Sequence, residues 1–271
     1  MRGSFQISDS AFRAIKSWLY STAGINLSDQ KRGMVAGRLA QRLRHFGLAS
    51  YDAYLHLLRE GAHPSEPQIA IDLLTTNETH FFREAVHFDA LREHALSVRR
   101  PGRIFRVWSA ASSSGEEPYS IAMTLADCLG DAHWEVLASD LSSRVLERAR
   151  SGHYAMARAD TIPRRYLLKY CLKGVGEQDG TFIVTPEIRA RVQFMQLNLV
   201  KKLPHIGTFD AVFVRNVMIY FDAPTKRDLM ARIAPLTKSD TLLFIGHSES
   251  LYGLGDDFDL VRPSIYRKRP A

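Results

Sequence analysis

The spacing of apolar residues changes near residue 100, and the two parts of the chain predict different structures. Up to about residue 75, apolar side chains such as Phe12, Ile15 and Leu19 recur every three or four residues, which is the period of an α-helix. From about Arg103, short apolar runs typical of β-strands alternate with helical stretches. The sequence therefore predicts an all-α N-terminal region followed by an α/β region.

Polar caps and glycines indicate where the N-terminal helices begin and end. Ser8-Asp9-Ser10 can supply the N-cap of a first helix. Ser28 and Asp29 open a second helix that runs towards Arg44 and stops at Gly47. Two further helices are expected over Tyr51–Arg59 and Ile69–Leu74.

Four apolar runs in the second region predict β-strands, with helices after the first two. The expected strands are Ile104–Ala110, Trp134–Leu141, Phe209–Val214 and Thr241–Gly246, and the expected helices are Tyr119–Leu129 and Ser142–Ser151. This alternation favours a parallel sheet with right-handed crossovers. Between about Tyr166 and Val192, Gly174, Gly176 and Gly180 interrupt the rhythm and predict a small antiparallel β insertion.

Composition narrows the class of protein but not its activity. The 271 residues are 45% hydrophobic and 24% charged, as in a globular protein. No apolar run approaches the roughly 18 residues that a membrane-spanning helix needs. The two cysteines, Cys128 and Cys171, lie outside any metal-ligand spacing and favour a reducing compartment, so we expect a cytoplasmic protein. The formal charge of +7 favours an acidic partner, whether nucleic acid, an anionic membrane or an acidic protein.

Two strand ends carry the candidate binding chemistry, because ligands of open α/β sheets lie beyond the carboxyl ends of the strands. Small residues over 109–114 and then Gly115 would let the backbone approach a ligand closely, ahead of a helix N-terminus. Asp140, after the second strand, can accept hydrogen bonds from two ribose hydroxyls. A capping role explains Asp140 alone equally well. The combination favours an adenosine-type cofactor.

Segments in a fixed order along the chain carry a family resemblance. They are NETHFFRE over 77–84, GEEPYS over 115–120, ASDL over 138–141, FDAVFVRNVMIYF over 209–221 and GHSESL over 246–251. Together they closely resemble the chemotaxis receptor methyltransferase (CheR) family, over nearly the whole chain. The serine-rich loop stands where many class I methyltransferases have G-x-G-x-G, and this departure matches the family.

The resemblance implies a fold with three parts. They are a helical substrate-docking domain over 1–75, a linker over 76–100 that contributes to the cofactor site, and a Rossmann-like methyltransferase domain over 101–271 with a β-subdomain at about 166–192. The implied reaction transfers a methyl group from S-adenosylmethionine to glutamate γ-carboxylates of chemoreceptor cytoplasmic helices. The products are S-adenosylhomocysteine and the glutamyl methyl esters used in chemotaxis adaptation.

The resemblance also implies partners and cofactor. The partners are chemoreceptor cytoplasmic domains and, in some family members, a receptor C-terminal peptide held by the β-subdomain, here near Lys173–Gly180. We expect no nucleic acid, no membrane insertion and a monomer. We also expect no metal, because the histidines show no H-x-x-x-H spacing.

Family analogy assigns the site residues. Those expected to bind the cofactor are Asn77, Thr79, Arg83, Glu117, Asp140, Asn198, Leu199, Arg215 and Asn216. Glu116 is expected to be a solvated residue at the helix start, although the roles of Glu116 and Glu117 can be exchanged.

The pKa of a glutamate side chain is near 4.3, so the substrate carboxylate is already anionic at neutral pH and needs no general base. Arg83 is the candidate to steer that carboxylate and Tyr220 to orient it, and these are the predicted catalytic residues.

A basic stripe on the second helix is the candidate for substrate docking. At about 100° per residue, Lys31, Arg38 and Arg42 share one arc of the helix, beside an apolar arc. Such a stripe can meet acidic receptor helices. Such a stripe is more often simply a solvated helix face.

Two other functions compete with this hypothesis. A methyltransferase acting on RNA is compatible with the positive charge, although no RNP-like aromatic motif is present. A non-catalytic adaptor that retains the cofactor fold is the second, and the presence of Arg83, Asp140, Asn216 and Tyr220 argues against it.

Overall fold

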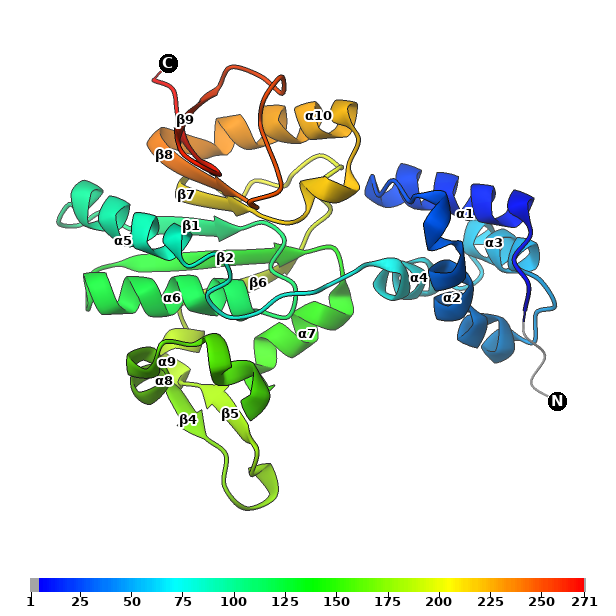
Figure 1. The fold of residues 1–271 in the computed structure, drawn as a ribbon, viewed down its shortest axis with the longest axis horizontal. Helices are drawn as coiled ribbons and strands as arrows, with labels where there is room; N and C mark the ends of the chain where they lie inside the picture. The colour runs from blue at the N-terminus through cyan, green and yellow to red at the C-terminus, as the bar shows by residue number, and fades with distance from the viewer. Residues whose placement is uncertain (1–4, 271) are drawn as a thin grey trace. The chain divides into compact units, whose positions relative to one another are not determined.

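The computed structural model describes residues 5–270, which divide into two compact units (Figure 1). The first unit holds the described residues up to Thr76 together with Tyr220–Thr225, and the second holds Asn77–Ile219 and the described residues from Lys226. The first unit is all-α. Its elements are α1 (Asp9–Ala23), η1 (Asp29–Lys31), α2 (Arg32–Phe46), α3 (Tyr51–Glu60) and α4 (Glu66–Leu74).

The predicted ends of the N-terminal helices are largely confirmed. The Ser8 side chain accepts a hydrogen bond from the backbone N–H of Ala11 at 3.1 Å and so caps α1. Gly47 and Gly61 end α2 and α3 in the left-handed conformation that glycine adopts without strain. Helix α4 begins earlier than predicted, at Glu66.

A buried ion pair holds the first unit together. The carboxylate of Glu66 accepts two hydrogen bonds from the Arg42 guanidinium, at 2.8 and 2.6 Å, and one from the Tyr54 hydroxyl at 2.5 Å. Hydrogen bonding to Glu66 raises the pKa of Arg42. Arg38 donates from Nη1 to the last carbonyls of α4, with the contact to Thr75 the shortest at 2.9 Å. Both arginines therefore fasten α4 to α2.

These contacts show which side chains of the basic stripe are engaged inside the first unit. The guanidinium groups of Arg38 and Arg42 bind inside their own unit, because they satisfy a buried carboxylate and the orphan carbonyls at a helix end. Lys31 lies in η1, ahead of α2, and is exposed. Of the three residues predicted to dock a substrate, Lys31 is the one whose side chain stays at the surface.

The second unit is built on a mixed seven-stranded sheet, in the order β6-β2-β1-β7-β8-β10-β9. Strands β6, β2, β1, β7 and β8 pair in parallel, and β10 and β9 continue the sheet antiparallel. The bounds are β1 (Phe105–Ser109), β2 (Trp134–Asp140), β6 (Val192–Gln196), β7 (Phe209–Val214), β8 (Thr237–Ile245), β9 (Phe258–Arg262) and β10 (Ile265–Lys268).

Helices cover this sheet and connect its parallel strands. Figure 1 shows α5 and α6 side by side, and both contact the sheet. The helical elements are α5 (Val86–Val98), α6 (Glu116–Leu129), α7 (Ser143–Ser151), η2 (Met156–Thr161), α8 (Arg164–Tyr170), η3 (Gly176–Gln178), α9 (Pro186–Arg189), η4 (Met218–Tyr220), α10 (Ala223–Ile233) and η5 (Ala234–Leu236). Residues 76–100, expected as a linker, thus contain α5, whose Phe88 and Leu91 are buried in the core of the second unit.

The predicted small antiparallel sheet is present but begins earlier than expected. Its strands are β3 (His153–Ala155), β4 (Cys171–Lys173) and β5 (Thr181–Val184), in the order β3-β5-β4. Strand β6, at the end of the segment assigned to the insertion, instead pairs in parallel with β2 at the edge of the large sheet. The insertion was misplaced because β3 has three residues with one buried side chain, too little for a sequence signal.

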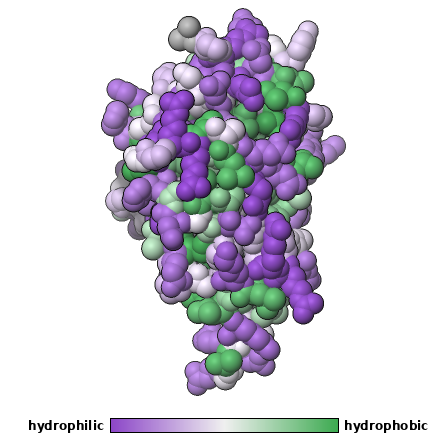
Figure 2. Space-filling view, turned by 90° about the vertical axis from the view of Figure 1, so that its left-hand side faces the viewer, coloured by the Kyte–Doolittle hydropathy of each residue, from purple (hydrophilic) through white to green (hydrophobic). Residues whose placement is uncertain are grey.

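The described residues contain no helix that is long and apolar enough to cross a membrane. On the face drawn in Figure 2, hydrophilic residues separate the apolar patches from one another.

Candidate functional site

The sheet order places the candidate site at the carboxyl ends of β1 and β7. These two strands are neighbours, and the chain order runs outwards from them in opposite directions, through β2 and β6 on one side and β8 on the other. Ligands of open α/β sheets bind at such a switch point. The segments that follow β1, β2, β6 and β7 contain most of the residues predicted to bind the cofactor.

Asp140, at the end of β2, fixes the serine-rich loop that follows β1. Its Oδ2 accepts a hydrogen bond from Ser113 N at 2.8 Å, and its Oδ1 accepts one from Ser142 N at 2.9 Å. The Ser113 hydroxyl in turn donates to the Asn77 carbonyl at 2.9 Å. The structure therefore brings together two predicted residues, Asn77 and Asp140.

The serine-rich loop also offers an unsatisfied polar group. Among the described residues, Ser112 Oγ is buried without a hydrogen-bond partner. Buried polar groups are normally paired, so an orphan hydroxyl in a loop of small residues fits a site that receives a polar ligand. The residues present fit an adenosine-type cofactor.

Gly115 is required by packing inside the second unit. Its φ is +99°, in the region that side chains rarely adopt. A Cβ there would lie 2.7 Å from the Tyr154 hydroxyl oxygen and 2.9 Å from Ala149 Cβ. The Tyr154 hydroxyl donates to the Ser114 carbonyl at 2.8 Å, so it cannot move away without releasing the loop.

Glu116 is buried, contrary to the expectation of a solvated residue. Its carboxylate accepts from Arg158 Nη1 at 2.6 Å and from the Ser114 hydroxyl at 2.7 Å. The same Arg158 nitrogen donates to the carbonyl of Thr79 at 3.0 Å. Arg158 therefore ties the segment before α5 to the start of α6, and nothing in its sequence neighbourhood marks this long-range contact.

A buried chain of charges lies beside this loop. Arg215 donates from Nη1 to Glu117 Oε2 at 2.8 Å and lies 3.1 Å through Nη2 from Glu84 Oε2. Its side chain is 1% exposed, and Nη2 also donates to the Arg83 carbonyl at 2.5 Å. Glu117 accepts a second hydrogen bond from the Ser109 hydroxyl at 2.7 Å. The guanidinium predicted to line the cofactor wall is thus committed to protein groups.

Burial and Arg215 shift the pKa values of the two carboxyl groups in opposite directions. Burial raises the pKa of Glu117, and the opposing effects of Arg215 and Ser109 do not overcome it. At Glu84 burial acts in the same sense, but Arg215 and the backbone N–H of His247 outweigh it and lower the pKa. Glu84 is therefore the firmly ionised partner of Arg215.

Arg83 differs from Arg215 in having no fixed counter-ion. Its guanidinium donates to the Glu78 carbonyl at 3.3 Å, and no carboxylate in residues 5–270 forms a salt bridge with it. The side chain is half-buried. A partly desolvated arginine without an acidic partner can receive an incoming anion.

Glu249, for which the sequence indicated no role, holds the backbone after β7 and β8. Its carboxylate accepts hydrogen bonds from the backbone N–H groups of Gly246, Asn216 and Ile219, at 2.6, 2.9 and 3.1 Å. Asn216 is in the left-handed conformation, with φ of 57°. The signal that could have identified Glu249 is its position just after a buried strand, where strand-end loops meet.

The remaining predicted residues lie at two places. Asn198 and Leu199 follow β6, whose end is tied to β2 by a hydrogen bond from Leu197 N to the Asp140 carbonyl at 2.9 Å. They therefore lie at the same edge of the sheet as Asp140. Tyr220 groups with the first unit, where its carbonyl accepts a hydrogen bond from Asn26 N at 2.8 Å.

Comparison with known proteins finds relatives of both units. The all-alpha domain of CheR methyltransferases matches residues 10–75, and the SAM binding domain of CheR methyltransferases matches residues 77–266. The chemotaxis protein methyltransferase of Salmonella typhimurium is 48% identical over 263 residues, covering 96% of this chain and 90% of the relative. That of Escherichia coli K12 is 48% identical, covering 96% and 91%. Chemotaxis protein methyltransferase 2 of Pseudomonas aeruginosa is 42% identical over 243 residues, covering 88% and 86%.

Replacing Gly115 by alanine is expected to lower the free energy of unfolding of the second unit by about 2–4 kcal/mol, because overpacking adds to the strain of a positive φ. Gly180→Ala is the matched control, since Gly180 has φ of +79° with nothing within 4 Å of an added Cβ. Urea denaturation of both variants measures the difference. Equal losses in the two variants would show that packing against Tyr154 contributes nothing.

Proposed function

The chain belongs to the CheR methyltransferase family, and we propose that it methylates glutamate γ-carboxylates of chemoreceptor cytoplasmic helices, using S-adenosylmethionine, during chemotaxis adaptation in the cytoplasm. The observation that carries this proposal is the match of both family domains, in order, to the two units of the chain. The high identity to chemotaxis protein methyltransferases over nearly the full length of each relative supports it.

The proposed reaction is a displacement that needs no proton transfer. S-adenosylmethionine supplies an electrophilic methyl group on a sulfonium. A γ-carboxylate oxygen forms the new bond to the methyl carbon, while the carbon–sulfur bond breaks and its electron pair returns to sulfur. The products are a neutral methyl ester and S-adenosylhomocysteine. The protein therefore acts by positioning and by desolvating the carboxylate.

The distribution of charge around Arg83 suits this task. Arg215 pairs with both Glu84 and Glu117 and so offsets one of their two negative charges. Arg83 keeps its own charge unpaired and can form a bidentate contact with the substrate. In the proposal, Arg83 aims one oxygen of the substrate at the methyl carbon, and Tyr220 is the candidate to orient the substrate through its hydroxyl.

The proposed cofactor residues surround the switch point. Asp140 receives the ribose, and Asn77, Thr79 and Glu117 lie along the serine-rich loop and the start of α6. Asn198, Leu199 and Asn216 follow strands that end at the same edge of the sheet. Lys31 in the first unit contributes to receptor docking through its exposed ammonium, and this contribution weakens with salt.

The small sheet is proposed as the site of a receptor C-terminal peptide. Strand β4 is an edge strand, and Leu172 on it is 53% exposed. Exposed apolar residues Leu168 and Val175 flank it, and Figure 2 shows apolar surface at the lower tip of the molecule, where this sheet lies. An edge strand can accept an extended peptide as a further strand. The exposed cations near β4, such as Lys173, favour an acidic peptide.

Methyl transfer is tested with labelled S-adenosylmethionine and receptor cytoplasmic fragments. We expect label in fragments with glutamate at the candidate sites and none where glutamine or alanine replaces it. The label should leave as methanol in alkali, because an ester hydrolyses and a methylated nucleobase does not. Label that resists alkali, or that enters RNA in preference to the receptor, would contradict the proposal.

Arg83→Ala is expected to lower turnover about 100-fold and Tyr220→Phe about 10-fold, since small errors in positioning carry losses of this size. In each variant, the fold-change in affinity for S-adenosylhomocysteine should be smaller than the fold-loss of turnover. Arg99→Ala, at an exposed arginine of the same unit, is the control and should leave both quantities unchanged. Turnover retained by both test variants, with calorimetry showing unchanged product binding, would refute the assigned roles.

Peptide binding is tested by fluorescence anisotropy with short acidic peptides from receptor C-termini. Leu172→Asp is expected to weaken binding at least 10-fold, because it places a charge on the edge strand that the peptide would cover. Leu260→Asp makes the same change at an exposed residue of β9, 63% exposed, and should have no effect. Absence of any signal with the unmodified chain would exclude the tether while leaving methyl transfer untouched.

A further inference from the structure

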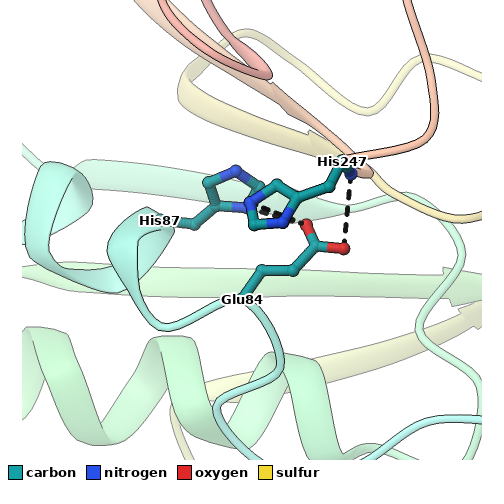
Figure 3. A group of neighbouring side chains, drawn as sticks. All are labelled: Glu84, His87 and His247. Carbon is teal, nitrogen blue, oxygen red and sulfur yellow. Dashed lines mark hydrogen bonds and ion pairs between the residues drawn. The ribbon is translucent and has the colours of Figure 1, made fainter.

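Three side chains that the reaction does not use converge in the second unit. Glu84 lies just before α5, His87 lies in its first turn, and His247 follows β8 (Figure 3). Glu84 Oε2 is 3.5 Å from His87 Nδ1 and 3.7 Å from His247 Nε2. One ligand atom from each residue lies within 4.8 Å of the others. Figure 3 shows both imidazole rings directed at the carboxylate.

The hydrogen bonds of Ser264 fix the tautomer of His87. The Ser264 hydroxyl donates to the Pro263 carbonyl at 2.6 Å, so its oxygen can only accept from His87 Nε2, at 2.8 Å. The proton of His87 is therefore on Nε2, and Nδ1 carries a lone pair. Burial of the His87 ring disfavours the charged imidazolium.

The lone pair on His87 Nδ1 faces the carboxylate of Glu84. Nδ1 is buried and has no hydrogen-bond partner among the described residues, and the His87 side chain is 0% exposed. Two electron-rich atoms that face one another in a buried site repel, and a cation bound between them would satisfy both. This orphan nitrogen, aimed into the cluster, is the observation that separates the site from a chance group of polar residues.

We propose that Glu84, His87 and His247 form a binding site for a divalent transition metal, with zinc as the ion that this ligand set suits. Two imidazoles and one carboxylate are a common set of zinc ligands with one open position. Bonds of roughly 2.0 Å in a tetrahedron separate ligand atoms by about 3.3 Å, close to the spacings of both histidines from Glu84. Ser264 provides the outer hydrogen bond that orients a metal-binding histidine. Water occupies the fourth position.

The charge around the site allows a dication. Arg215 opposes it, because its guanidinium lies 3.1 Å from Glu84 Oε2. Glu117 offsets Arg215 at 2.8 Å on the other side. Glu84 Oε1 also accepts a hydrogen bond from the backbone N–H of His247 at 3.3 Å, which leaves Oε2 as the oxygen directed at both rings.

A metal here would connect the start of α5 to the end of β8. Glu84 directly follows Arg83, so the ion would restrain the segment that carries the proposed catalytic arginine. The absence of H-x-x-x-H spacing in the sequence did not predict this site. Glu84 and His87 form an E-x-x-H pair on one segment, and His247 lies on a distant segment.

The test uses the full chain after removal of bound metal with a chelator. Calorimetric titration with Zn²⁺ should show about one equivalent bound per chain, and Co²⁺ in its place should give the visible absorption of a tetrahedral site. His247→Ala should weaken Zn²⁺ binding at least 100-fold and abolish the cobalt absorption. Ser264→Ala retains all three ligands and should weaken binding about 10-fold, as loss of an outer hydrogen bond does.

His205→Ala is the matched control, since His205 is an exposed histidine of the same unit outside the cluster, and its Zn²⁺ binding should equal that of the unmodified chain. Circular dichroism confirms that each variant is folded. No binding by the unmodified chain, or equal binding by the His247 and control variants, would overturn the proposal. Either result leaves methyl transfer to receptors unaffected, because that reaction is assayed separately.

Discussion

The buried guanidinium of Arg215 is the interaction on which the candidate site depends. It joins the end of β7 to Glu117 at the start of α6 and to Glu84 and the Arg83 carbonyl in the segment before α5. Removing one member of a buried ion pair costs about 3–5 kcal/mol, because the remaining charge is left without a partner in a poorly solvated place. The three segments therefore keep one arrangement. That arrangement fixes the position of the Arg83 backbone. It therefore determines where the Arg83 side chain can hold an incoming carboxylate.

Carboxylates also order the backbone at the strand ends. Asp140 holds the N–H groups of Ser113 and Ser142, and Glu249 holds those of Gly246, Asn216 and Ile219. Loops that would otherwise be mobile are thereby fixed before a ligand arrives. A displacement reaction without acid–base steps gains most from such preorganisation, because the alignment of the reacting atoms is the main contribution left to the protein.

The sequence predicted the parts of the fold whose signals are local. Strands β1, β2 and β7 were placed nearly to the residue, because each is a run of apolar side chains buried on both faces. Strands β9 and β10 were missed, since β9 is mostly exposed and its residues show no apolar run. Helix α5 was assigned to a linker, although Phe88 and Leu91 carry a helical spacing. The family resemblance, rather than periodicity, indicated the substrate and the cofactor.

What the sequence did not indicate are contacts between segments far apart in the chain. Glu116 was expected to be a solvated charge and Arg38 a docking residue, and only the packing of η2 and of α4 shows that each is paired with groups of its own unit. The same reason applies to Gly115, whose neighbour Tyr154 belongs to the small sheet. The sequence alone does not indicate whether an arginine side chain pairs with a carboxylate of the protein or binds a substrate. Arg215 and Arg158 have buried carboxylate partners, whereas Arg83 has none within residues 5–270, and this difference favours Arg83 as the group that receives an anionic substrate.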